Sequence, residues 1–324
     1  MMKAAVYHAY GFPDVVRIED VAKPVPKDDE VLVRVRAASV NPLDAGLMKG
    51  KPLTFRLLFG LSKPRLTRPG VDVAGEVEAV GAKATRFKAG DQVFGFCRGA
   101  FAEYVCAAES KLVIKPANVT YEAAASVAVA GFTALQGLRD KGRLQRGQKV
   151  LVNSAAGGVG TFAVQIAKWM GAEVTGACST TNLELVRSIG ADHVIDYTRE
   201  DFTKRKEPYD LIFDCYVNRS LNAYRNVLSR KGTYLMVGGP PRRWFVEMLA
   251  PLIQALLLSP LVSQRFVTFI AKPRQEDLRL LRELMSSGMV KPVIDRCYQL
   301  SEVSEAIRYL DARHARGKVV ISVP

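Results

Sequence analysis

Between residues 149 and 238, apolar runs of strand length alternate with longer segments whose apolar residues recur at helical spacing. Strict strand–helix alternation is typical of a parallel sheet wound with helices on both faces, and ligands of such sheets bind at the carboxyl ends of the strands. We therefore predict a Rossmann-like α/β domain here. Its strands are expected at residues 150–154, 173–177, 193–196, 209–215 and 232–238, and its helices at 161–170 and 183–189.

A turn of small residues, 154–160, joins the first of these strands to the first helix. Gly157 would let the backbone approach a diphosphate, and Gly160 would let the helix pack closely on the strand. The first N–H groups of the helix offer an anion site. Ala155 stands where the usual pattern has its first glycine, so a glycine-rich turn without a ligand is the alternative. The surrounding strand and helix favour a dinucleotide site.

The choice between NADH and NADPH depends on the end of the second strand, about 20 residues past the glycines, where NAD enzymes place an acidic residue on the ribose. Cys178 occupies that position, and residues 179–182 (Ser-Thr-Thr-Asn) are neutral. A neutral, hydroxyl-rich segment accepts a 2′-phosphate that a carboxylate would repel. We predict NADPH. A phosphate group usually pairs with a cationic side chain, which segment 179–182 lacks. Arg187 on the next helix or Arg199 after the third strand would have to supply this charge.

The segment before residue 127 has short apolar runs separated by Pro and Gly, which predict strands with close turns. We place a mostly β domain over residues 1–126 together with 272–324, whose last strand, 318–323, returns to it. The NADPH-binding domain is expected over 127–271, and the nicotinamide is expected in the cleft between the two. The N-terminal strands are predicted at 30–38, 73–80, 92–94 and 102–105.

The composition is that of a globular protein with two domains: 324 residues, 48% apolar and 24% charged. The five cysteines include no CxxC motif, and their odd number would leave one cysteine without a disulfide partner. Both facts favour a reducing compartment. No long apolar segment stands at the N-terminus, so we expect a cytoplasmic protein. The net charge of +14 suits phosphorylated cofactors, but no recognition motif with interleaved aromatics accompanies it, so we expect no primary nucleic-acid partner.

Several blocks in a fixed order cover nearly the whole chain and carry a family resemblance. They are 37–44 (AASVNPLD), 69–75 (PGVDVAG), 90–95 (GDQVFG), 130–134 (AGFTA), the glycine turn and 190–197 (GADHVIDY). With these blocks the chain resembles the medium-chain dehydrogenase/reductase superfamily, in its zinc-independent quinone oxidoreductase-like branch. The resemblance implies a GroES-like first domain, a Rossmann second domain and a homodimer.

The motif and the resemblance together give a set of expected NADPH-binding residues. They are Ser154, Ala155, Gly157, Gly158, Val159, Gly160, Cys178, Ser179, Asn182, Tyr197, Cys215, Val237, Gly238 and Phe269. Tyr197 is expected on the adenosine phosphate side, with simple packing as the alternative. Cys215 ends a strand near the expected cofactor, and an inert thiol is favoured over a reactive one.

Zinc-dependent relatives in this superfamily hold a catalytic metal with a Cys, a Gly-His-Glu and a second Cys. The matching positions here are Asn41, Val71 with Asp72, and Ala130. They leave no thiolate or imidazole for zinc. The run of four cysteines that holds a structural zinc in such relatives is missing as well. The three histidines, His8, His193 and His314, have no metal-ligand spacing, so we expect no metal site.

Without a Lewis acid, simple alcohols become poor substrates, whereas a quinone or an α,β-unsaturated carbonyl compound accepts hydride directly from NADPH. The protein then needs to orient the reactants and to bond the developing oxygen, while water gives the proton. The resemblance puts Asn41 and Asp44 in the polar wall near the nicotinamide; a plain Asn-Pro-Leu-Asp turn is the alternative. Thr133 is expected at the nicotinamide too, or else as a helix-start hydroxyl. Relatives often have a Tyr shortly after this Asp, but residues 45–47 are Ala-Gly-Leu.

Residues 244–262 are largely apolar with basic flanks, but two prolines argue against a spanning helix. A helix over the substrate cleft or a subunit contact is favoured over peripheral attachment to an anionic membrane. Two other functions stay open. One is an enoyl-thioester reductase on the same scaffold, and the other is a regulatory protein that binds NADPH without turnover and touches RNA through its basic surface.

Overall fold

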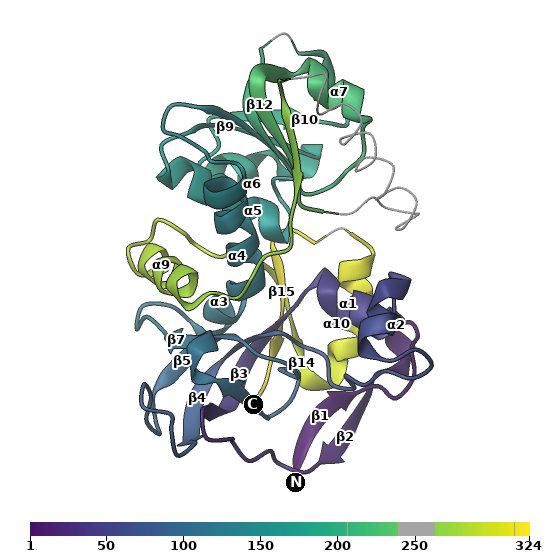
Figure 1. The fold of residues 1–324 in the computed structure, drawn as a ribbon, viewed down its shortest axis with the longest axis vertical. Helices are drawn as coiled ribbons and strands as arrows, with labels where there is room; N and C mark the ends of the chain where they lie inside the picture. Colours follow the sequence, from purple (N-terminus) through teal and green to yellow (C-terminus); the bar gives the residue numbers. More distant parts are fainter. Residues whose placement is uncertain (206, 239–262, 314) are drawn as a thin grey trace. The chain divides into compact units, whose positions relative to one another are not determined.

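The computed structural model describes residues 1–205, 207–238, 263–313 and 315–324 (Figure 1). The chain divides into two compact units, Met1–Val129 with Pro273–Pro324, and Ala130–Lys272. The apolar segment 244–262 lies outside the described residues. Across the described ranges no helix has both the length and the apolar character needed to cross a membrane.

The first unit is built mainly on antiparallel strands, with one parallel pair near the C-terminus. Its strands are β1 (Met2–Val6), β2 (Arg17–Val21), β3 (Glu30–Val40), β4 (Asp72–Val80), β5 (Gln92–Phe96), β6 (Tyr104–Ala108), β7 (Leu112–Ile114), β14 (Ile294–Gln299) and β15 (Lys318–Ser322). The main sheet has the order β14-β15-β3-β4-β5-β7, with β6 paired to β3, while β1 and β2 form a separate pair. The C-terminal strand β15 runs antiparallel to β3, with Val319 opposite Val40. The last strand predicted from the sequence therefore returns to this unit.

Helices and short turns complete the first unit. They are η1 (Pro13–Val15), α1 (Pro42–Lys49), α2 (Leu53–Phe59), η2 (Glu109–Lys111), α3 (Tyr121–Ala125), α9 (Gln275–Ser286), η6 (Leu300–Glu302) and α10 (Val303–Asp311). The core joins distant parts of the chain, since Val33, Val73, Ile307 and Val319 are all fully buried in one cluster. Helix α4 (Ala128–Gln136) begins in this unit and continues into the second.

The second unit is a parallel sheet with helices. Its elements are η3 (Gly137–Lys141), β8 (Lys149–Asn153), α5 (Gly158–Trp169), β9 (Glu173–Cys178), η4 (Thr180–Asn182), α6 (Leu183–Ser188), β10 (His193–Asp196), η5 (Phe202–Lys204), β11 (Tyr209–Asp214), α7 (Leu221–Asn226), β12 (Leu228–Met236) and β13 (Arg265–Thr268). The strand order is β10-β9-β8-β11-β12-β13, with every pairing parallel. Val150, Leu151 and Val152 are fully buried, as expected for a strand covered on both faces.

Two predicted strands differ from the structure. The run 102–105 does not form one strand, because Ala102 bridges to Ala4 of β1 and β6 starts only at Tyr104, where the chain joins β3. Strand β12 begins at Leu228 rather than at residue 232, since Leu228 already pairs with Tyr209 of β11. The exposed polar residues that follow Leu228 hide this start from a hydropathy pattern.

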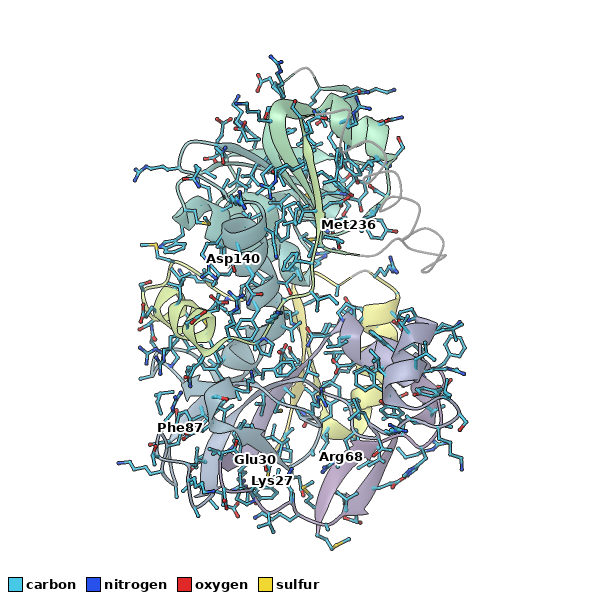
Figure 2. The ribbon with its side chains drawn as sticks, in the orientation of Figure 1. Lys27, Glu30, Arg68, Phe87, Asp140 and Met236 are labelled. Carbon is cyan, nitrogen blue, oxygen red and sulfur yellow. The ribbon has the colours of Figure 1, made fainter. Side chains whose placement is uncertain are left out.

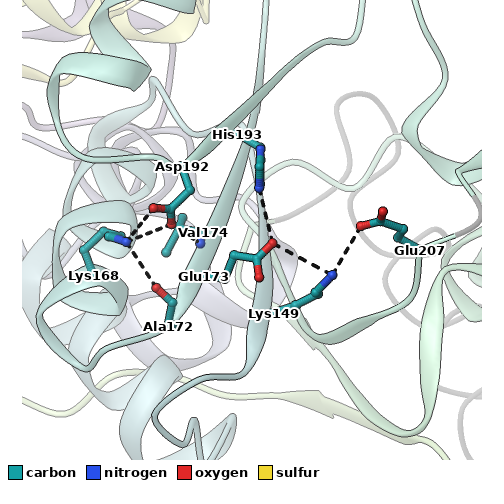
Figure 3. A network of polar contacts seen from close by, with 8 residues as sticks. All are labelled: Lys149, Lys168, Ala172, Glu173, Val174, Asp192, His193 and Glu207. Atoms are coloured by element: carbon teal, nitrogen blue, oxygen red, sulfur yellow. Dashed lines mark hydrogen bonds and ion pairs between the residues drawn. The ribbon is translucent and has the colours of Figure 1, made fainter.

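The amino ends of β8, β9 and β10 carry a network of ion pairs (Figure 3). Lys168 lies 2.7 Å from Asp192, whose other carboxylate oxygen accepts a hydrogen bond of 2.8 Å from the Val174 N–H. His193 contacts Glu173 at 3.2 Å and its side chain is 57% exposed. This histidine belongs to a surface network at the edge of the sheet opposite the predicted cofactor residues.

Candidate active site

The glycine turn after β8 has a tightly bonded backbone. Ser154 adopts the left-handed conformation with φ of 63°. The Ala155 N–H donates to the Ala177 carbonyl at the end of β9 (3.0 Å), and the Gly157 N–H donates back to the Ser154 carbonyl (3.1 Å). The turn is therefore fixed to the neighbouring strand before the helix begins.

Two glycines of the turn differ in the space around them. A Cβ at Gly160 would stand 2.1 Å from the Ser154 carbonyl oxygen, a backbone atom that cannot turn away. A Cβ at Gly157 would meet the Ser154 hydroxyl oxygen at 3.3 Å, which small shifts accommodate. Gly160 is thus required for packing of α5 on the turn, whereas Gly157 leaves open the face that a diphosphate would approach.

Helix α5 starts at this turn and presents an anion site. Gly157 is its N-cap, and the N–H groups of Gly158, Val159 and Gly160 have no partner within the helix. Gly158 and Val159 are only half-buried. These N–H groups and the positive end of the helix dipole suit the diphosphate of a dinucleotide. The residues present therefore fit NADPH at this position.

The other predicted cofactor residues gather at the same edge of the sheet. The Tyr197 N–H donates to the Cys178 carbonyl (3.1 Å), and the Cys215 N–H donates to the Asn153 carbonyl (3.2 Å). Gly238 lies so close to Cys215 that a Cβ there would be 1.9 Å from the Cys215 carbonyl oxygen. Because β8 and β11 are neighbours whose connections run in opposite directions, this edge is the topological switch point of the sheet.

Two further predicted residues lie at this edge of the sheet, and a third lies on α4. Val237 follows β12, and its N–H donates to the Asp214 carbonyl (2.9 Å). Phe269 follows β13 directly and is half-buried, as is Thr133 on α4. Their contact with a cofactor remains a prediction.

A buried carboxylate that the sequence reasoning missed holds the carboxyl ends of β8, β11 and β12 together. Asp214 is fully buried and accepts hydrogen bonds from the Tyr234 hydroxyl (2.7 Å), the Asn153 amide (2.8 Å) and the Tyr216 N–H (3.0 Å). Burial raises the pKa of Asp214, although these donors oppose the rise. Burial and the neighbouring Asp214 also raise the pKa of the Cys215 thiol, the opposite of what a reactive thiolate needs.

The neutral segment after Cys178 is folded on itself. The Asn182 amide donates to the Ser179 hydroxyl (2.9 Å), and the Thr180 hydroxyl donates to Asp196 (2.6 Å). The Thr180 hydroxyl therefore faces a carboxylate. Arg199 is 77% exposed, and its Nε lies 3.6 Å from the same Asp196 carboxylate. Of the two arginines considered for the 2′-phosphate, Arg199 is thus tied to this corner of the sheet.

In the first unit, Asn41 and Asp44 form the start of α1. The Asn41 N–H donates to the Asp44 carboxylate (2.8 Å) in a capping box, and the Gly70 N–H donates to the other oxygen of Asp44 (3.0 Å). Both residues are nearly fully buried. Burial raises the pKa of Asp44 to about 7. The turn chemistry considered from the sequence is present, and a role toward substrate remains a prediction.

A lysine that the sequence reasoning overlooked completes this cluster. Lys318, the first residue of β15, is 3% exposed and donates to the Asn41 amide oxygen (2.7 Å). Its ammonium also lies 3.6 Å from Asp72. Burial lowers the pKa of Lys318, while Asp72 and Asp44 oppose the change. A lysine ammonium thus bridges two positions that match metal ligands in zinc-dependent relatives.

Asp72 also links this cluster to α4 by hydrogen bonds. Its Oδ2 accepts from the Ser39 hydroxyl (2.7 Å) and from the Asn41 amide (2.9 Å), and its Oδ1 accepts from the Val129 N–H (3.0 Å). All polar atoms of the Asn41 side chain are therefore engaged within the first unit. Over the described residues, no three His, Cys, Asp or Glu side chains come together in a way that could hold a metal ion.

Two family models match parts of the chain. A model of the alcohol dehydrogenase GroES-like domain matches residues 27–117, and a model of zinc-binding dehydrogenases matches residues 189–321. A chloroplastic NADPH-dependent alkenal/one oxidoreductase of Arabidopsis thaliana is 34% identical, over 99% of this chain and 79% of that protein. A chloroplast envelope quinone oxidoreductase homolog of the same plant is also 34% identical, over 99% and 98%.

The structure also resembles solved ones. The quinone oxidoreductase from Coxiella burnetii superposes with a TM-score of 0.88 at 29% identity, over 100% of this chain and 99% of that chain. The similarity thus extends over both units.

Proposed function

The chain belongs to the quinone oxidoreductase-like branch of the medium-chain dehydrogenase/reductase superfamily, and on that premise we propose that it reduces quinones or α,β-unsaturated carbonyl compounds with NADPH. The observation that carries the proposal is the turn at Ser154–Gly160, where backbone N–H groups, an open Gly157 and a closely packed Gly160 form a diphosphate cradle at the switch point of the sheet. NADPH, when bound, supplies the hydride.

We propose an electron-poor acceptor because the positions that match the catalytic zinc ligands of zinc-dependent relatives have no thiolate or imidazole to hold a Lewis-acidic metal ion. Asn41 and Asp72 are engaged by the Lys318 ammonium, and Ala130 has no ligand atom. A quinone or enone needs no metal, since hydride addition gives a delocalised hydroquinone or enolate oxygen. This chain then has to orient the acceptor and donate a hydrogen bond to that oxygen. We propose that the Thr133 hydroxyl donates this bond, and that Asn41 and Asp44, whose polar atoms are held by bonds inside the first unit, form the polar wall near the nicotinamide. Water supplies the final proton.

NADPH is proposed over NADH because of the corner formed by Cys178, Asp196 and Arg199. Position 178 itself is a cysteine, not the acidic residue that binds the ribose in NAD enzymes. Arg199 pairs with Asp196 through Nε, but its side chain is 77% exposed, and we propose that it also pairs with a 2′-phosphate. The name of the Arabidopsis alkenal/one oxidoreductase includes NADPH dependence, which supports the same choice.

We also propose a cytoplasmic homodimer. All five cysteines are free, as expected in a reducing compartment. The plant relatives are chloroplastic, so the compartment is tested by fractionation of cells that make the tagged full chain. Light scattering after size exclusion tests the dimer.

The experiment for the activity is a panel of acceptors followed by NADPH absorbance. Short quinones, 2-alkenals and enones should be turned over, whereas saturated aldehydes and primary alcohols should not. A 2-enoyl thioester in the same panel tests the alternative of an enoyl-thioester reductase. If NADPH binds but no acceptor in the panel is reduced, the protein is a binder and the proposal is wrong.

A further inference from the structure

Helix α2 exposes an unusual amount of apolar surface. None of its residues is buried. Four leucines on or next to it are strongly exposed: Leu53 (68%), Leu57 (70%), Leu58 (69%) and Leu61 (69%). Single exposed leucines are ordinary on a protein surface, but a contiguous group of this kind marks an interaction site.

The opposite side of α2 fixes the helix to its unit. The Phe55 ring lies so close to α1 that a Cβ at Gly46 would stand 3.2 Å from it. The Tyr10 hydroxyl donates to the Gly60 carbonyl (2.6 Å), and the Arg56 guanidinium lies 4.6 Å from the Tyr10 ring centroid. The helix is thus held by its aromatic side and the adjoining Gly60, and the leucines are presented outward.

Basic residues flank these leucines along the chain. The chain between Asp44 and Asp72 has six basic residues and no acidic one. Lys51, Lys63 and Arg65 are exposed, and in the part of the chain that the structure describes none of them forms an ion pair. Arg68, labelled in Figure 2, lies away from α2, against Gly99. The Arg65 N–H donates to the Phe59 carbonyl (2.7 Å), so the basic loop folds back onto α2.

We name this surface the leucine–basic patch: Leu53, Leu57, Leu58 and Leu61 with Lys51, Lys63 and Arg65. A second copy of the chain is a poor occupant, because it would bring two sets of unpaired cations together. Nucleic acid offers phosphates but no apolar phase for the leucines. An anionic lipid bilayer offers both, with headgroup charge for the basic side chains and an acyl boundary for the leucines.

We propose that the leucine–basic patch docks the protein on the surface of anionic lipid bilayers. The docking itself is independent of the reaction. Its use rests on the proposed function, since lipophilic quinones and lipid-derived enals partition into the bilayer that the protein would contact. The overall charge of +14 favours the same surface.

The test is co-sedimentation of the full chain with phosphatidylcholine vesicles that either contain or lack phosphatidylglycerol, at low and high salt. We expect binding to the anionic vesicles alone, reduced by salt. The variant L57S/L58S removes apolar contact and K63E/R65E reverses two charges, and each should weaken partitioning by at least roughly tenfold. The matched controls are V25S, an 84% exposed valine outside the patch, and K88E/K204E, which gives the same net charge as K63E/R65E.

Three results would overturn the proposal: no binding of the unmodified protein to anionic vesicles at low salt, equal losses in the control variants, or patch variants that instead change the oligomeric state. The last result would assign the patch to self-association. Turnover of a water-soluble enone is measured in the same variants and should stay unchanged. Vesicle binding without enone turnover would refute the proposed function alone, and turnover without vesicle binding would refute the docking alone.

Discussion

Replacing Gly160 and Gly157 separately by alanine tests the diphosphate cradle, because the structure assigns the two glycines different tasks. At Gly160 the added methyl group would lie 2.1 Å from the Ser154 carbonyl oxygen and 2.9 Å from the Ala155 Cα. Backbone on both sides must shift to relieve this. Overpacking of a buried position costs about 1–3 kcal/mol of unfolding free energy, and a displaced turn also loses its ligand geometry.

At Gly157 the same substitution has little effect on the fold. The φ and ψ of −80° and 173° suit alanine, and the nearest atom to the new Cβ is the Ser154 hydroxyl oxygen at 3.3 Å. The unfolding free energy should change by less than about 1 kcal/mol. The methyl group would nevertheless stand where the diphosphate approaches, so the Kd for NADPH should rise at least about tenfold, equal to about 1.4 kcal/mol.

Urea unfolding and NADPH titration by calorimetry measure the two effects on the same preparations. Gly160→Ala should lose stability and affinity together, whereas Gly157→Ala should lose affinity alone. Unchanged NADPH affinity in Gly157→Ala would mean that the cofactor does not lie on this turn. Unchanged stability in Gly160→Ala would refute the packing argument.

Three further predictions concern buried or cofactor-side charges. Lys318→Met leaves Asp72 buried without its cation and should lower the free energy of unfolding in urea by about 3–5 kcal/mol. The control is Lys115→Met, at a buried lysine that donates to the backbone carbonyls of Pro116 and Val119, and it should lower this free energy clearly less. Equal losses in the two variants would contradict the ion-pair argument. Burial raises the pKa of Asp44 from its ordinary 3.8 to about 7, so the folded state binds the proton more tightly than the unfolded state. The free energy of unfolding should therefore fall by about 1.4 kcal/mol per pH unit as pH rises between these two values. Asp44→Asn should flatten this slope in urea unfolding at pH 4 to 7, and an unchanged slope counts against the assignment. Arg199→Glu should lower kcat/KM for NADPH about tenfold while that for NADH stays level, and equal losses with both would remove Arg199 from the phosphate site.

The parallel sheet could be predicted because its signals are local. Val150–Val152 is a short apolar run before a glycine turn, and α5 follows with apolar residues at helical spacing, so strand, turn and helix lie within one stretch of the sequence. The carboxyl ends of parallel strands must meet at one edge, which brings Cys178, Cys215 and Gly238 near the turn without further information.

The polar clusters could not be predicted, because they join residues that are far apart in the chain. Lys318 meets Asn41 across 277 positions, and only the register of β15 on β3 brings them together. A lysine at the start of an otherwise apolar strand was the available signal. The network of Asp214 with Tyr234 similarly needs neighbouring strands in register. The exposure of α2 is a property of packing, since an apolar run gives no sign of which side faces water.

The central claim is direct hydride transfer from NADPH to an electron-poor carbon without a metal. The measurement is reduction of an enone by NADPH deuterated at the transferred C4 position, with chelator-treated protein and mass spectrometric and NMR analysis of the product. We expect one deuterium on the β-carbon, a solvent proton on the α-carbon and a rate that chelation does not change. Absence of the label from the β-carbon, or activity that chelation abolishes and zinc restores, would contradict it.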